Sequence, residues 1–450
     1  FLFPDRNLPD VSFVASGRLH NETSQTSLDN VKLALGEITA SVDGKLFPDN
    51  RFDLSVKAAG PDAAVLGSLL GTSLPAESFS LASGLSGNPS NFQLKDLDLY
   101  LGKSKVDGNL SIGLGDTRHF KGNLDSPYLD ISHWTTGDKA EDKPKPAAKK
   151  QWMFDDTPVM RLAENQLDID LDLKVAELNL GNSAIKDIEM RFLISHQLLE
   201  LKPFTLKGMQ GGQYRGEFSL DSSSGMPEMH LVMSGKNLRL GLAAAPGQDP
   251  STYPPVDLDV TLDGAGQTRR ALASSLTGKA RVYQGSGQLA NAGLDVFFSD
   301  FLTQLFTTLN PFAKTSQVTQ LDCAVMAADA EAGLVKVFPV IFQTEQLTIL
   351  SDGTVDLNTE KINLSFNTKP RKGLGLSGGA LINSMIKVGG TLTAPAVELD
   401  PAGTIAGGGL AVATMGISVL AKSWSDRFLS SKDPCGEARK EIEKRDSAVN

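Results

Sequence analysis

Residues 167–175 read Leu-Asp-Ile-Asp-Leu-Asp-Leu-Lys-Val. Apolar side chains occupy every second position, and three aspartates and a lysine stand between them. Side chains of a β-strand alternate between its two faces, so this run places its apolar groups on one face and its charges on the other. As a helix, the same run would spread charge around the whole surface. The stretch therefore predicts a strand with one apolar face and one solvated face.

The same alternation recurs at 52–56, 106–114, 256–262 and 355–366. Asp-Gly pairs at 43–44, 107–108, 263–264 and 352–353 punctuate these runs, and we expect them to form hairpin turns or strand starts. Many amphipathic strands with few helices between them predict a mainly β fold, in which an elongated, curved antiparallel sheet carries a few short capping helices.

The apolar face of such a sheet has two possible destinations. In a compact sandwich it would meet a second apolar face and form a closed core. In an open sheet it would line a hydrophobic groove, and a large uncovered apolar surface implies that something binds there. Periodicity does not choose between these alternatives. The candidate groove residues are Leu167, Ile169, Leu171, Leu173, Val256, Leu258, Val260, Ile362, Leu364 and Phe366.

Four segments depart from the strand pattern. A short helix is expected between Pro61 and Gly71, and apolar residues at helical spacing predict an amphipathic helix over 293–311. Residues 402–421 are uncharged and rich in Gly and Ala, which favours a packed or interfacial helix over a membrane span. Charge, proline and alanine at 136–151 indicate a linker. The expected regions are 1–135 (β-rich), 136–151 (linker), 152–401 (β-groove) and 402–450 (helix and charged tail).

Composition narrows the function. The net charge of -10 argues against a nucleic-acid-binding protein, because such affinity comes largely from Lys and Arg. The chain begins Phe-Leu-Phe-Pro without Met or a signal peptide, so we expect a mature form or a fragment whose N-terminal anchor is missing. Its two cysteines, Cys323 and Cys435, form no CxxC pair. From the residues alone they are either one disulfide or two unrelated thiols.

No constellation of catalytic or metal-binding residues emerges. The five histidines are not spaced as metal ligands or near a cysteine. Residues 375–379 fit the G-x-S-x-G nucleophile elbow, but no histidine follows Ser377, as that arrangement requires. A G-x-G-x-x-G match at 373–378 lacks the surrounding βαβ series of a dinucleotide site. We therefore predict no enzyme, no metal and no cofactor.

The order of several short blocks resembles a known family. The blocks run from the strand at 167–180 through 185–188, 198–204, 211–216, 273–278 and 285–294, and then from Cys323 to 333–335, 353–357, 362–364, 369–371 and 388–395. Together they cover roughly 162–401 and resemble the C-terminal half of AsmA-family proteins. Each block alone is only a strand with a turn, whereas their order is fairly specific. The part before Thr136 fits the family's upstream repeats only loosely.

This resemblance carries expectations about function. It implies an envelope protein of Gram-negative bacteria, anchored in the inner membrane by an N-terminal helix, with its body in the periplasm. Similar proteins are bridge-type carriers whose groove holds phospholipid acyl chains between inner and outer membranes, with outer-membrane or envelope proteins as further partners. The family pattern also implies a disulfide between Cys323 and Cys435. A rival interpretation is a non-transporting assembly factor for outer-membrane proteins, which would use exposed strand edges.

Overall fold

The computed structural model describes eleven stretches of the chain: residues 12–70, 74–132, 152–159, 167–180, 184–208, 211–239, 248–290, 318–345, 347–371, 385–400 and 427–449. The predicted linker at 136–151, the helix at 293–311, the glycine motifs at 373–379 and the segment 402–421 lie outside them. The predicted region boundaries also fall outside them, so that division of the chain stays a prediction. The chain forms two compact units, residues 1–141 with 162–206 and residues 142–161 with 207–450.

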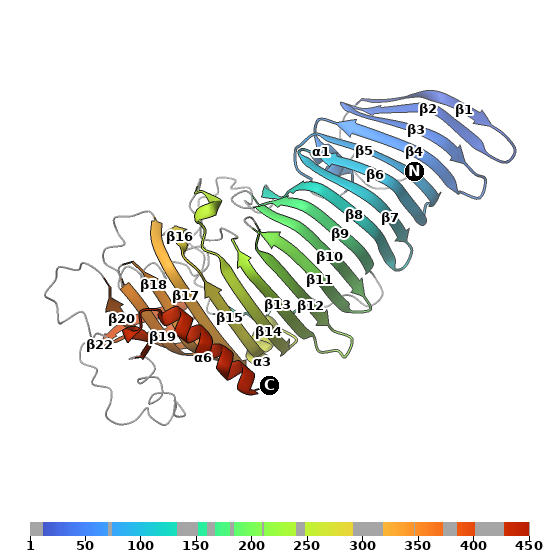
Figure 1. The fold of residues 1–450 in the computed structure, drawn as a ribbon. Coiled ribbons are helices and arrows are strands. Elements are labelled where there is room, and N and C mark those ends of the chain that lie inside the picture. The colour runs from blue at the N-terminus through green and yellow to red at the C-terminus, as the bar shows by residue number, and fades with distance from the viewer. Residues whose placement is uncertain are drawn as a thin grey trace. The chain divides into compact units, whose positions relative to one another are not determined.

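The first unit is an antiparallel meander in which neighbouring strands of the chain pair with one another (Figure 1). Its helix α1 (Ala63–Leu70) is the one expected between Pro61 and Gly71. The strands are β1 (Phe13–Asn21), β2 (Thr26–Leu35), β3 (Ile38–Leu46), β4 (Phe52–Gly60), β5 (Phe79–Asn88), β6 (Asn91–Leu101), β7 (Ser104–Leu114), β8 (Arg118–Asp130), β9 (Leu167–Asn179), β10 (Ala184–Ser195) and most of β11 (Leu198–Gly208).

One strand pair of this unit departs from the predicted antiparallel pattern. Strands β8 and β9 are parallel, and Phe120 lies opposite Ile169. Antiparallel neighbours can be joined by a two-residue turn, whereas parallel neighbours need a crossover of a dozen or more residues. The connection from 131 to 166 supplies that length, and its residues 152–159 belong to the second unit.

The second unit repeats the meander with β12 to β15 and β17 to β22, and β16 pairs with β17. Its helices include α3, which begins after the N-cap Thr268, and α6 near the C-terminus, drawn in red in Figure 1. The elements are β12 (Gln213–Asp221), β13 (Glu228–Leu238), η2 (Pro250–Thr252), β14 (Val256–Ala265), α3 (Arg269–Ser275), β15 (Thr277–Gln284), β16 (Gly287–Ala290), β17 (Val318–Glu331), β18 (Leu334–Thr344), β19 (Leu347–Asp356), β20 (Lys361–Pro370), β21 (Met385–Thr391), β22 (Ala394–Asp400) and α6 (Pro434–Val449).

The mainly β, antiparallel architecture with few helices is confirmed, but the expected role of the Asp-Gly pairs is wrong. All four pairs lie inside strands. At Gly44, where φ is +135°, a Cβ atom would stand 2.2 Å from the carbonyl oxygen of Asp53 on the next strand. Glycine is needed there for close approach of two backbones, not for chain reversal. Observed hairpin turns use other residues, such as His196-Gln197 and Ala332-Gly333, all with positive φ.

Candidate functional site

The four candidate residues on β9 lie on the apolar face of the first unit. Cross-strand pairing places Ile169 between Phe120 and Ile194, and Leu171 beside Phe192. Because side chains directly opposite each other in a sheet share a face, these pairs form apolar rows that run across the strands. One row follows the cross-strand pairing from β3 to β10 and contains Leu46, Phe52, Gly87, Phe92, Ile112, Phe120, Ile169 and Ile194.

Contacts and exposure along this row show how the face is packed. The rings of Phe52 and Phe92 lie 6.4 Å apart, centroid to centroid, across the strand that carries Gly87. Ile169, Leu171 and Leu173 are half-buried, and Leu167 at the strand end is 37% exposed. A closed sandwich would bury such positions. Within the described residues of the first unit, this apolar face therefore keeps part of its contact with solvent.

The six remaining candidates share one face of the second unit. Pairing through β15, β17, β18 and β19 places Leu258 and Phe366 in one row and Val260 and Leu364 in the next. A third row contains Val256 and, on β19, Ile349. The row of Leu258 contains Val282, Met326, Val340, Ser351 and Phe366. The structure thus brings the candidates together as two sets, one in each unit.

Exposure varies along the face of the second unit. Met326, in the middle of the row, is 40% exposed, and Val256, Leu258 and Val260 are half-buried. Near the other end of the row, Phe366 is buried in a cluster with Leu347, Ile349 and Val388, against which Ile362 and Leu364 pack. Sequence alternation did not single out Met326, because β17 is apolar on both of its faces.

The opposite face of the first unit carries the charges. Asp170 on β9 accepts a hydrogen bond from Arg191 at 2.9 Å and lies 3.3 Å from the ammonium group of Lys121. The hydrogen bond from Arg191 lowers the pKa of the Asp170 carboxyl, and Lys121 lowers it further. These residues lie on the adjacent strands β8, β9 and β10, so cross-strand ion pairs connect the strands on the solvent-exposed face of the sheet.

On the opposite face of the second unit, α6 covers an apolar patch. Val325, Ala327, Ile341 and Leu350 alternate with the apolar row described above, and they pack against four residues of the C-terminal segment. Those residues are Phe428, Cys435, Ala438 and Ile442. From the sequence, this segment was predicted only to be a charged tail. Its signals were the N-cap Asp433, the following Pro434 and the i, i+4 spacing of Ala438 and Ile442.

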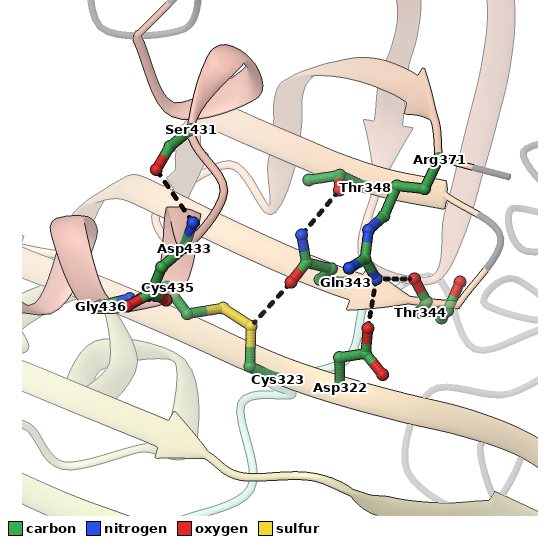
Figure 2. Close-up of a disulfide and its surroundings, with 10 residues drawn as sticks. All are labelled: Asp322, Cys323, Gln343, Thr344, Thr348, Arg371, Ser431, Asp433, Cys435 and Gly436. Carbon is green, nitrogen blue, oxygen red and sulfur yellow. Dashed lines mark hydrogen bonds and ion pairs between the residues drawn. A yellow bond between two sulfur atoms is a disulfide. The ribbon is translucent and has the colours of Figure 1, made fainter.

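Cys323 and Cys435 form a disulfide, as the family resemblance implied, and it ties α6 to β17 (Figure 2). Next to it, Gln343 donates a hydrogen bond to Thr348 at 3.1 Å, and its Oε1 lies 3.6 Å from Cys323 Sγ. A second attachment of α6 is ionic: the nearly buried guanidinium of Arg281 donates to both carboxylate oxygens of Asp446 at 3.0 and 2.8 Å.

Two kinds of feature are lacking among the residues that the structure describes. In that part of the chain, no group of three or more His, Cys, Asp or Glu side chains is arranged as a metal site. None of its helices combines the length and the apolar character that a membrane span requires.

A family model described as the AsmA family matches residues 72–337. The chain belongs to the AsmA family. The match begins inside the region that was expected to fit only loosely, and it ends before the blocks at 353–395 on which the resemblance partly rested. Neither a curated protein nor a solved structure matches this AsmA-family chain. Membership of the AsmA family is consistent with a role in envelope lipid transport or assembly.

Proposed function

We propose that this AsmA-family protein is a non-enzymatic carrier of phospholipids between the inner and outer membranes of a Gram-negative bacterium. In this proposal it works in the periplasm and supports outer-membrane biogenesis and integrity. An N-terminal anchor holds it to the inner membrane, and acyl chains lie against the apolar sheet faces. One observation carries the proposal: rows of aligned apolar side chains cross the strands of each unit and remain partly exposed.

The energetics of such a face suit passive transport. Each CH₂ group kept from water stabilises the bound state by about 0.8 kcal/mol. The row through Phe120, Ile169 and Ile194 crosses the strands without a charged residue, so a chain that slides along it exchanges similar contacts. Polar head groups stay in water along the open side, since burying an unpaired charge is costly.

A test of binding starts from protein purified without detergent. Native mass spectrometry is expected to show co-purifying phospholipid, and a photoactivatable phospholipid is expected to cross-link to β9. The variant Ile169→Asp/Leu171→Asp places two carboxylates on the apolar face, so cross-linking should fall at least tenfold.

The matched control is Ala59→Asp/Gln93→Asp. It adds the same charge at exposed positions of the opposite face, where the cross-strand neighbours are uncharged. Cross-linking of the control should equal that of the unchanged protein. Circular dichroism establishes that both variants are folded. Unimpaired lipid cross-linking in the folded Ile169→Asp/Leu171→Asp protein would refute the carrier proposal.

A second candidate function rests on β1, which among the described strands pairs only with β2. All nine of its residues are exposed, including Phe13 at 66%, Val14 at 60% and Leu19 at 69%. An exposed apolar edge can accept another strand, which is how a non-transporting assembly factor for outer-membrane proteins would act. Substituting Val14→Lys and Leu19→Lys separates the two functions. Lipid cross-linking that survives in this variant while client binding is lost would favour assembly.

A further inference from the structure

The apolar face of the first unit contains a pocket of about 160 Å³. Its floor is formed by Leu99 and Leu101 of β6, Val106 of β7 and Leu129 of β8, all on the apolar side of the sheet. Leu99 lies opposite Val106, one row inward from the strand ends. The segment between α1 and β5 forms a wall through Pro75 and Glu77.

This wall is fixed to the sheet by packing and by the backbone. Leu74 and Val65 pack with Leu101 around the buried cluster of Ile38, Ala63 and Phe79. The backbone N–H of Ala63 donates to the carbonyl of Glu77 at 2.8 Å. The elements around the pocket are therefore fixed in place. Because the lining is mostly apolar, a polar group inside the pocket would lack hydrogen-bond partners, whereas a hydrocarbon chain needs none.

Two carboxylates, those of Glu77 and Asp130, line the pocket at the sheet edge where β6 and β8 end. Asp130 accepts hydrogen bonds from Ser132 Oγ at 2.6 Å and Asn179 Nδ2 at 3.0 Å, so its position at the end of β8 is set. The carboxylate of Glu77 lies against Gly102 in the turn after β6, where an added Cβ would meet it. An anionic phosphate or carboxylate head group placed at this end would meet like charge.

We propose that this pocket receives the methyl end of a lipid acyl chain and so fixes which way a bound lipid points on this face. The inference rests on the carrier function proposed above and adds orientation to it. An apolar cavity of about this size holds a benzene-sized molecule, so roughly six carbon atoms fit. The anionic head group then lies toward other rows of the face, away from Glu77 and Asp130.

The size of the effect follows from hydrocarbon burial. Each CH₂ sheltered from water raises occupancy about fourfold, the equivalent of about 0.8 kcal/mol. Val106→Phe fills the pocket with a ring while keeping the face apolar, and it should reduce occupancy more than tenfold. Val56→Phe is the matched control. It makes the same change on the same face of β4, at a position that does not line the pocket.

The experiment uses two phosphatidylglycerol probes, one with a diazirine at the end of an acyl chain and one with a diazirine beside the ester carbonyl. After irradiation of the full chain, labelled peptides are identified by mass spectrometry. We expect the chain-end probe to label peptides containing Leu99, Val106 or Leu129, and the ester-side probe to label other strands. In Val106→Phe the label at these peptides should fall more than tenfold, whereas Val56→Phe should leave it unchanged.

The outcomes distinguish the pocket from the carrier function. Chain-end labelling spread over the apolar face, and unaffected by Val106→Phe, would overturn the pocket and leave the carrier proposal in place. Labelling of the pocket by the ester-side probe would also overturn it, because the lipid would then point the other way. Absence of any labelled peptide would overturn both proposals. The result with the unchanged protein decides the question even if Val106→Phe does not fold.

Discussion

Removal of the Cys323–Cys435 disulfide should destabilise the second unit alone. The bond closes a loop with a sequence separation of 112 residues. In the chain-entropy account, cross-linking a loop of this length removes freedom from the unfolded chain that is worth about 5 kcal/mol. With a urea dependence of about 3 kcal/mol per M, as expected for a unit of this size, the unfolding midpoint of the second unit should fall by about 1.7 M.

The assay must resolve the two units, because a single unfolding curve would average them. Pulsed hydrogen exchange across a urea series, with peptides resolved by mass spectrometry, reports each unit separately. We compare the unchanged protein, the same protein under dithiothreitol, and Cys323→Ala/Cys435→Ala. Peptides from 318–371 should lose protection at lower urea after reduction or substitution, and peptides from 79–130 should not.

The packing of α6 predicts that this helix stays in place even without the disulfide. Ala438 and Ile442 lie fully inside the cluster formed with β17 to β19, so α6 should stay docked without the disulfide in the absence of urea. Exchange of α6 peptides should therefore remain slow in the reduced protein. A midpoint shift below about 0.3 M, or equal shifts in both units, would contradict the loop argument. Full exchange of α6 on reduction alone would contradict the packing argument.

Three further predictions concern single residues of the second unit. Ile442→Ala should lower the free energy of unfolding of this unit by about 2 to 5 kcal/mol, and Ile442→Val by about 1, measured in urea. The hydrogen bond from Arg281 holds the pKa of the Asp446 carboxyl below its ordinary value of 3.8. The pair therefore stabilises the fold above pH 3.8, and this stabilisation is lost as the pH falls through the lowered pKa of Asp446. The drop in urea midpoint from pH 6 to pH 3 should therefore be smaller in Arg281→Met, and an equal drop would contradict this. Buried Glu360 accepts backbone N–H groups of the segment 152–159 at 2.8 and 2.7 Å, so Glu360→Gln should speed proteolysis within that segment about tenfold, and an unchanged rate would count against it.

Alternation in the sequence predicted the strands and the faces of their side chains. The run at 167–175 became β9, with its leucines and isoleucine on one face and its aspartates on the other. This succeeded because a strand exposed to water on one side must alternate. Alternation was weaker for β17, where Val325 and Met326 are both apolar, since α6 covers one face and the apolar row runs along the other.

The prediction that the Asp-Gly pairs form turns or strand starts was wrong because glycine serves two different purposes in β structure. Short turns favour it for its backbone conformation, but Gly44 and Gly353 stand within strands, where a Cβ would meet a carbonyl oxygen of the neighbouring strand. The approaching carbonyls belong to Asp53 and Asn363 on the next strand of the hairpin, so an Asp-Gly pair by itself does not show which of the two uses its glycine has. The parallel pairing of β8 with β9 was equally hidden, because it depends on the path of the connecting segment.

The mainly β character of the chain and its amphipathic strands follow from the amino-acid sequence, since a periodicity of two is a local property of the residues. The folded structure was needed to learn which strands pair, which apolar side chains line up as rows, and that α6 and the disulfide cover one face of the second unit. It also decided that a pocket opens between β6, β7, β8 and the segment after α1. Register and packing join residues far apart in the chain, and no local pattern specifies such contacts.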